Sequence, residues 1–444
     1  MASKKELVEA QSFAKRRLTT AFVAGAPGGR EVEPHRPMRA VFGGLALTAV
    51  ILIGSLATGL ISGSMPSGWQ NNRLIIAKES GARYVSVQGV LHPVSNTTTA
   101  RLLIPADEFE VLNVREDLLA PKERGPALGI VGAPDSLPSA ERLIPSDWVS
   151  CLHADGRGVT SQLGGVISRA AVDRAALVTT DGETFLIIDG VRWPVSGTNL
   201  PRVLAALRLE TLTARSAPAS WTNLFPLGDA LTPITVSSAG ERRAGLLPGT
   251  AIGSVVVVGG DTESGRYLVT EAGVLDPLTP LANALYRAGT GQSVPADVQI
   301  TPAQLATTEV NSTPTTYPAW PTTIPTALDE HACAVLDAGA DDTATVTLGT
   351  ADLEVRPSGT ETFVLAGGGA LVRSVGDPEK PRTGPVFVID QEARAYAVEG
   401  RSEDLLERLG YSADLVTPVP AAWLELFADG PVLSVEAAAR PVTG

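Results

Sequence analysis

The chain has 444 residues, of which 44% are hydrophobic and 5% aromatic, and its 48 acidic and 35 basic residues give a formal net charge of −13. This length allows more than one domain. The acidic balance excludes nucleic-acid binding as the main function, because an acidic surface repels a phosphate backbone.

A basic segment, residues 1–39, opens the chain, with eight lysines and arginines against four glutamates. It begins with Ser3-Lys4-Lys5-Glu6, the pattern of a helix capping box. The apolar residues that follow recur at the spacing of one helical face: Leu7, Ala10, Ala14, Leu18 and Ala21. We predict an amphipathic helix here, and its basic composition suits a helix that lies on anionic lipid.

An uncharged apolar run of 22 residues follows, from Ala40 to Ile61. As a helix it would be roughly 33 Å long, enough to cross a hydrocarbon core of about 30 Å. We therefore predict one transmembrane helix. Because short basic segments stay in the cytoplasm, the N-terminus is expected there and the large C-terminal region outside it. A cleaved signal peptide is the alternative, but its apolar region is usually about 7–15 residues long and its leader is short.

Beyond Trp69 the chain contains a diverged internal repeat in four copies. Each copy has the pattern of a strand, a tight turn, a second strand, a glycine turn, a short third strand and a helix. In the first three copies a proline follows the turn glycine by four residues, and the fourth copy lacks it. The landmark residues are Tyr84, Gly89 and Pro93 in the first copy; Phe185, Gly190 and Pro194 in the second; Tyr267, Gly273 and Pro277 in the third; and Tyr396 and Gly400 in the fourth. The helices are expected at 98–103, 201–209, 280–288 and 402–409.

The spacing of the copies is uneven, which argues against a tandem solenoid or a propeller. We infer a central β-domain assembled from separate stretches, with the four repeats projecting from it. The expected fold class is thus a single transmembrane helix followed by a mainly-β (α+β) region, in which a discontinuous central β-domain carries four small diverged α+β repeats. The expected boundaries are a basic segment at 1–39, the transmembrane helix at 40–61, a linker at 62–72, repeats at 73–125, 173–215, 251–290 and 376–444 (the last with the C-terminal segment), and central-domain parts at 126–172, 216–250 and 291–375.

The only two cysteines, Cys151 and Cys333, both fall in the region expected outside the cytoplasm, where oxidation is possible. A disulfide between them is the preferred interpretation. They also lie in the mirrored contexts Cys151-Leu152-His153 and His331-Ala332-Cys333, which leaves a Cys₂His₂ zinc site as the alternative. The one-residue spacing is tighter than usual for structural zinc, and an oxidising compartment opposes it.

The segment from Tyr84 to Asn96, YVSVQGVLHPVSN, resembles the EccB family of actinobacterial type VII (ESX) secretion systems. The C-terminal part, with Val419–Leu426 and Gly430–Ser434, resembles the same family, as do the basic leader, the single span and the two cysteines. The resemblance covers essentially the whole chain.

The resemblance implies a structural subunit of an inner-membrane secretion complex that is built with an EccC-type ATPase, EccD and EccE. It implies a single-pass protein of the cell membrane with a cytoplasmic N-terminus and an elongated periplasmic region, in which a central β-domain carries four repeat domains. It also makes homo-oligomerisation in the complex an expectation, and the N-terminal helix an assembly element.

Some members of this family are described as ATPases, but the chain contains no G-x-x-x-x-G-K-[ST] run to cradle phosphates. It also contains no G-x-S-x-G nucleophile turn. We therefore expect no catalytic, cofactor-binding or metal-binding residues and no cofactor. The alternative function is that of a membrane-tethered exported hydrolase or ligand-binding receptor.

Overall fold

A computed structural model describes residues 3–24, 38–61, 64–156, 158–259, 265–294, 297–328, 331–338, 343–353, 359–376, 380, 382–400 and 402–442. The chain divides into two compact units, Met1–Pro66 and Ser67–Gly444. Each unit is described by itself below.

The described residues of the first unit form two helices, α1 (Lys4–Ala24) and α2 (Met38–Ile61). The predicted capping box starts α1: the Ser3 backbone N–H donates to Glu6 Oε2 (2.8 Å), and the Glu6 N–H donates to Ser3 Oγ (3.4 Å). The apolar run lies in α2, and the side chains of residues 54–61 are outside the described part. Within the described residues, no helix has both the length and the apolarity that a membrane crossing requires.

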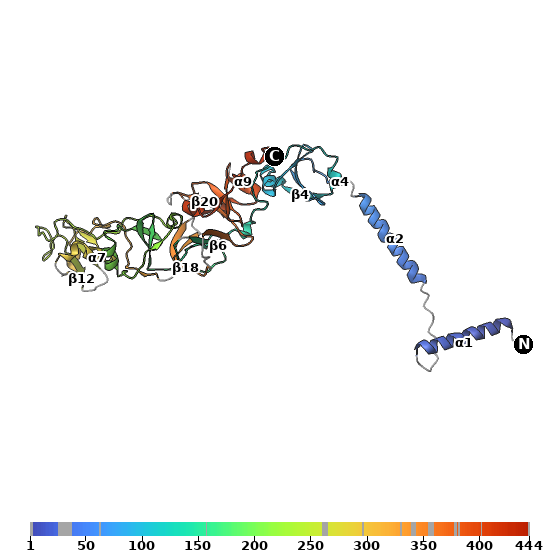
Figure 1. The fold of residues 1–444 in the computed structure, drawn as a ribbon, viewed down its shortest axis with the longest axis horizontal. Helices are drawn as coiled ribbons and strands as arrows, with labels where there is room; N and C mark the ends of the chain where they lie inside the picture. Colours follow the sequence, from blue (N-terminus) through green and yellow to red (C-terminus); the bar gives the residue numbers. More distant parts are fainter. Residues whose placement is uncertain are drawn as a thin grey trace. The chain divides into compact units, whose positions relative to one another are not determined.

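Within its described residues, the second unit contains five sheets, of which four share one strand arrangement. Figure 1 shows the helices and strands of this unit, coloured along the sequence. We call these four the first to fourth small sheets, in chain order, and the remaining one the central sheet. In each small sheet the first strand pairs antiparallel with the second, and the second pairs antiparallel with the third. A helix then crosses over, so that the fourth strand returns parallel to the first. A short helical turn follows this fourth strand.

The first small sheet consists of β1 (Arg73–Ala77), β2 (Arg83–Val87), β3 (Val90–Pro93) and β4 (Glu110–Val114), with helices α3 (Thr97–Leu103) and α4 (Glu116–Leu119). The second consists of β8 (Arg174–Thr180), β9 (Glu183–Ile188), β10 (Val191–Pro194) and β11 (Arg215–Ser216), with α5 (Leu200–Leu207), α6 (Ala219–Thr222) and the added strand β16 (Thr326–Ala327). The third consists of β12 (Val255–Val258), β13 (Arg266–Val269), β14 (Leu275–Pro277) and β15 (Val298–Ile300), with α7 (Pro280–Ala288) and α8 (Pro302–Ala306).

The fourth small sheet differs from the sequence expectation. Its strands are β20 (Ala370–Val375), β21 (Val386–Ile389), β22 (Arg394–Val398) and β23 (Thr417–Pro420), with α9 (Ser402–Leu409), α10 (Ala421–Leu424), the added strand β24 (Ala428–Asp429) and α11 (Val435–Ala438). Because β23 returns parallel to β20, the first strand is β20, which was expected in the central domain. The hairpin β21–β22 therefore supplies the second and third strands, not the first and second. One hairpin resembles another in sequence, and only the long-range pairing distinguishes them.

The central sheet is assembled from two separated stretches of chain. Its strands are β5 (Trp148–Leu152), β6 (Val159–Leu163), β7 (Ser168–Ala170), β17 (Cys333–Ala338), β18 (Ala344–Ala351) and β19 (Thr360–Val364), in the order β19-β6-β5-β17-β18-β7. Short 3₁₀ helices lie elsewhere: η1 (Ala106–Glu108), η2 (Ala140–Arg142), η3 (Thr290–Gln292) and η4 (Ala413–Leu415).

Among the residues that the structure describes, three apolar cores join the sheets into a series. Residues of the first and fourth small sheets share one core, the central sheet shares a second core with the second and fourth, and the second and third share another. Side-chain alternation explains this sharing, because a strand buried on both faces can supply a different core from each face. On β5, for example, Trp148 and Leu152 face the shared core while Val149 and Cys151 face the opposite side.

Candidate functional site

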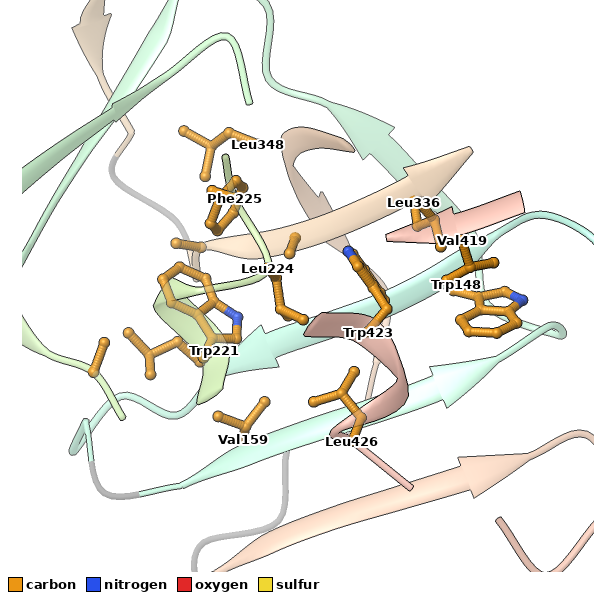
Figure 2. Close-up of a cluster of buried hydrophobic side chains, with 14 of the residues drawn as sticks. Trp148, Val159, Trp221, Leu224, Phe225, Leu336, Leu348, Val419, Trp423 and Leu426 are labelled. Carbon is orange, nitrogen blue, oxygen red and sulfur yellow. The ribbon is translucent and has the colours of Figure 1, made fainter. Parts of the chain in front are cut away.

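The core shared by the central sheet with the second and fourth small sheets is built around three buried tryptophans. Figure 2 shows Trp148 on β5, Trp221 on α6 and Trp423 on α10 in this core. Each is 0% exposed. The Trp221 indole N–H donates to the Ser150 backbone oxygen on β5 (2.9 Å). The ring of Trp423 lies edge-on to that of Trp148, with the centroids 6.4 Å apart.

The short helices α6 and α10, which carry Trp221 and Trp423, lie in two copies of one sequence motif. This motif was not among the sequence-based predictions. Residues 218–231 and 420–433 both read P-A-x-W-x-x-L-F-x-x-G-x-x-L. In each copy the tryptophan and the following Leu-Phe pair are buried in the same core. Comparison of these two stretches with each other, rather than of the hairpins, is the signal that could have found it.

The motif glycines Gly228 and Gly430 share a role with Gly125, which has the corresponding position in the first small sheet. A Cβ atom on Gly125, Gly228 or Gly430 would lie within 2.5 Å of an aromatic ring on the third strand. The rings are those of His92, Trp193 and Tyr396, in the first, second and fourth small sheets. Tyr396 thus occupies the position of His92 and Trp193, whereas the sequence analysis aligned it with Tyr84 and Phe185.

The other landmark residues lie at turns and at the ends of strands. Tyr84, Phe185 and Tyr267 on the second strands lie opposite the prolines Pro93, Pro194 and Pro277. Gly89, Gly190 and Gly273 lie in the turns between second and third strands, and all have positive φ. Gly400 lies beyond β22, also with positive φ, and closely approaches Leu405 of α9.

The turn glycine of the second small sheet contacts the central sheet directly. A Cβ atom on Gly190 would lie 1.9 Å from the Val346 backbone oxygen on β18. Beside it, burial and the neighbouring charge of Asp173 raise the pKa of Asp189. The equivalent Gly89 has open space around its Cβ position. This turn is therefore a docking contact in the second small sheet but not in the first.

The third small sheet replaces the aromatic–glycine pair with a polar one. Asp276 on β14 occupies the aromatic position and Asn311 the glycine position. The buried Asp276 carboxylate accepts hydrogen bonds from the Asn311 side chain, from the backbone N–H groups of Thr315 and Thr316 (2.8 Å each), and from both threonine hydroxyls. Burial alone would raise the pKa of Asp276, but these hydrogen bonds outweigh it and hold the pKa below its ordinary value. The carboxylate therefore orders the 311–316 loop.

Replacing Asp276 with asparagine should lower the free energy of unfolding by about 2 kcal/mol at neutral pH, because charge-assisted hydrogen bonds are lost. The folded pKa is depressed, so the carboxylate contributes its stability above the unfolded pKa of about 3.9 and loses it as pH falls through the folded pKa. Urea denaturation should therefore show the difference between wild type and variant shrinking below about pH 4. Asp181→Asn, at an exposed hairpin turn, is the control and should change little. A pH-independent difference would contradict this assignment.

The proline-rich segment 311–325 runs outside helices and strands and packs on the small sheets. Tyr317 and Trp320 stack with centroids 5.6 Å apart and are buried in the core that joins the second and third small sheets. The Tyr317 hydroxyl donates to the Pro277 oxygen (2.7 Å). Further along, the Thr323 hydroxyl donates to Asp173 (2.8 Å), which ties the segment to the start of the second small sheet.

The predicted disulfide is present between Cys151 and Cys333, which lie opposite each other on β5 and β17. Both sulfurs are engaged in this bond, so the zinc alternative has no thiolate ligands. His153 is buried with Nε2 2.9 Å from the Thr160 hydroxyl, while His331 is exposed. In the described stretches of the chain, no three His, Cys, Asp or Glu residues are placed to hold a metal ion.

Replacing both cysteines with alanine should lower the free energy of unfolding by about 2–4 kcal/mol, because the bond closes a loop between residues 182 apart. Chemical denaturation of the oxidised protein and of the variant measures the loss. Reduction of the wild-type protein with a strong thiol reductant should reproduce it. If the reduced wild type and the variant were both as stable as the oxidised protein, the proposed contribution would be wrong.

The comparisons with known proteins agree over nearly the whole chain. The family model described as "Type VII secretion system ESX-1, transport TM domain B" matches residues 1–442. The chain is 28% identical over 443 residues to the ESX-3 secretion system ATPase EccB3 of Mycolicibacterium smegmatis, covering 91% of this chain and 84% of the relative. It is 26% identical over 432 residues to the ESX-1 secretion system ATPase EccB1 of Mycobacterium tuberculosis, covering 90% and 86%.

Two solved structures have similar folds. The EccB3 dimer from the ESX-3 core complex matches with a TM-score of 0.65 at 25% identity, covering 83% of this chain and 99% of that one. A chain of the intact ESX-5 inner membrane complex matches with a TM-score of 0.65 at 23% identity, covering 100% and 96%.

Proposed function

Because the chain belongs to the EccB family of type VII secretion systems, we propose that it is a structural core subunit of an ESX inner-membrane complex that exports proteins. The observation that carries this proposal is the family match over residues 1–442. The buried side chains support it, since the tryptophan motif, the disulfide and the glycine contact all join sheets to one another.

The proposed topology has a cytoplasmic N-terminus, a single span at 40–61 and a periplasmic region beyond it. Support comes from the 22-residue uncharged run, the basic flank and the family description as a transport transmembrane domain. In this arrangement α1 acts as a cytosolic assembly element or lies on the inner lipid surface.

The proposed domain division follows the sequence boundaries, with one change. Four small sheets of one strand order support four repeats around a central domain. The fourth repeat is best begun at β20, since this strand completes the shared arrangement.

The proposed partners are an EccC-type ATPase, EccD and EccE, together with further copies of this chain. A similar solved structure is an EccB3 dimer, and another comes from an intact ESX-5 inner membrane complex. The chain of the ESX-5 complex is similar to this chain in fold, and it supports the proposal through that shared architecture alone.

Nucleotide hydrolysis is the second candidate function, because several relatives carry the name ATPase. The chain contains no Walker-type run with a Gly-Lys pair, so a phosphate site of that kind has no backbone–lysine cradle. We propose that the energy for transport is supplied by a partner ATPase. Purified full-length protein should accordingly release no phosphate from ATP above the level of a mock purification, and sustained turnover by the purified chain would favour the second candidate.

The decisive experiment is affinity purification of the tagged chain from gently solubilised native membranes, followed by mass spectrometry and sizing. Recovery of EccC-, EccD- and EccE-like proteins in one large particle is expected. Recovery of the chain alone, from membranes that contain those partners, would contradict the core-subunit role.

A further inference from the structure

We propose that a pocket beside the third small sheet binds a small ligand that is rich in hydrogen-bond donors and carries an ammonium group, as amino sugars and amino alcohols do. The pocket has a volume of about 430 Å³, within the range of small-molecule sites. Its wall combines apolar surface from Val236, Ala272 and Val274 with hydroxyl and amide groups, which come from Thr235, Ser237, Thr270, Asn311, Thr315 and Thr316.

The hydrogen bonds within the wall decide which ligand chemistry it accepts. The Thr270 hydroxyl donates to the Val274 backbone oxygen (2.9 Å). The Thr315 and Thr316 hydroxyls donate to Asp276 (3.0 and 2.9 Å). A hydroxyl has one proton, so these three oxygens have only lone pairs left for a ligand. These three hydroxyls therefore favour a ligand that donates hydrogen bonds.

The loop that forms this wall is ordered before any ligand arrives. Asp276 is 0% exposed, and a buried carboxylate is costly unless it is well hydrogen-bonded. All its side-chain hydrogen bonds named above go to Asn311, Thr315 and Thr316, which line the pocket. At the same position of the second and fourth small sheets, Trp193 and Tyr396 hydrogen-bond instead to Ile188 and Asp390 of their own sheets. Preorganisation of this kind lowers the entropic cost of binding.

The charge of the pocket favours a cation. Glu271 supplies an exposed carboxylate to the lining, and none of the described lining residues is basic or aromatic. The Arg243 guanidinium donates to the Glu271 backbone oxygen (3.4 Å), but its charge is paired with the Glu241 carboxylate (3.1 Å). The region beyond residue 39 has 44 acidic and 27 basic residues, a formal charge of −17, which attracts a cationic ligand and repels anions.

The test is calorimetric titration of the full-length protein in detergent with glucosamine and with glucose, at a slightly acidic pH where the amine is protonated. Glucosamine should bind saturably, and glucose should bind at least about tenfold more weakly. Glu271→Gln should weaken glucosamine binding about tenfold, because the ammonium loses its counter-charge. Glu392→Gln is the matched control, since Glu392 is an exposed glutamate in the corresponding turn of the fourth small sheet, between β21 and β22. This variant should bind as the wild type does.

Three results would overturn the proposal: no saturable binding of glucosamine, equal binding of glucose and glucosamine, or equal loss in the two glutamine variants. Glu271 is exposed, so its substitution should leave folding intact, and urea denaturation checks this. The proposed site does not depend on the secretion role, because binding is measured on the isolated chain.

Discussion

Replacing Gly190 with alanine should destabilise the second unit by about 2–5 kcal/mol. The added methyl group would lie 1.9 Å from the Val346 backbone oxygen and 2.8 Å from its carbonyl carbon. β18 pairs with β17 on one side and β7 on the other, so its backbone cannot move away without loss of ladder hydrogen bonds. The positive φ of +74° adds a cost of about 1 kcal/mol for a residue with a Cβ. Chemical denaturation of the full-length protein in detergent measures the effect.

Gly89→Ala is the matched control for this prediction. Gly89 lies in the same kind of turn, with φ of +82°, but its Cβ position has no atom within 4 Å. Only the cost of the positive φ remains for this variant, so its free energy of unfolding should fall by about 1 kcal/mol. Equal losses in the two variants would mean that the approach of the second small sheet to the central sheet does not contribute.

Replacing either motif tryptophan with alanine should lower the free energy of unfolding about as much as Gly190→Ala does. Trp221→Ala and Trp423→Ala should each cost about 3–5 kcal/mol, because each leaves a cavity in the core that joins three sheets. Denaturation should also become less cooperative if the small sheet separates from the central sheet before it unfolds. Trp69→Ala is the control: Trp69 is only partly buried and lies under Lys122, so its loss should be about 1 kcal/mol or less. A loss as small as this in both motif variants would contradict their docking role.

A milder pair of variants separates packing from hydrogen bonding. Trp221→Phe loses the indole N–H bond to Ser150, whereas the Trp423 indole N–H has no hydrogen-bond partner among the described residues. Trp221→Phe should therefore cost about 1 kcal/mol more than Trp423→Phe. Chemical denaturation measures both losses. If Trp423→Phe were the more destabilising variant, ring packing rather than the indole hydrogen bond would dominate at both sites.

The local elements of the fold were largely predictable from sequence. The helices α7 and α9 begin and end where the apolar spacing and capping residues predict. In the first three small sheets, the turns between the second and third strands fall at the expected glycines, Gly89, Gly190 and Gly273. Each has a positive φ, which favours glycine. On α5, the apolar residues Val203 and Leu207 are buried, and Leu204 is partly buried.

Long-range relations were harder to predict. β20 was expected in the central domain, because a single strand carries no mark of the partner with which it pairs. Gly89 and Gly190 have the same place in the sequence repeat, although only the Cβ position of Gly190 meets another backbone. The tryptophan motif was not predicted, since α6 and α10 are single helical turns too short for apolar periodicity to reveal.

The sequence by itself determined the apolar run, the charge balance, the order of hairpins and helices, and the resemblance that the family match confirms. These features depend on residues that are near one another in the chain, where spacing and turn chemistry act directly. Only the tertiary structure decided which strand closes the fourth small sheet, which tryptophans join it to the central sheet, and how Asp276 orders the pocket loop. Those contacts join residues distant in sequence, and their energies come from burial and hydrogen bonds that exist only after the chain has folded.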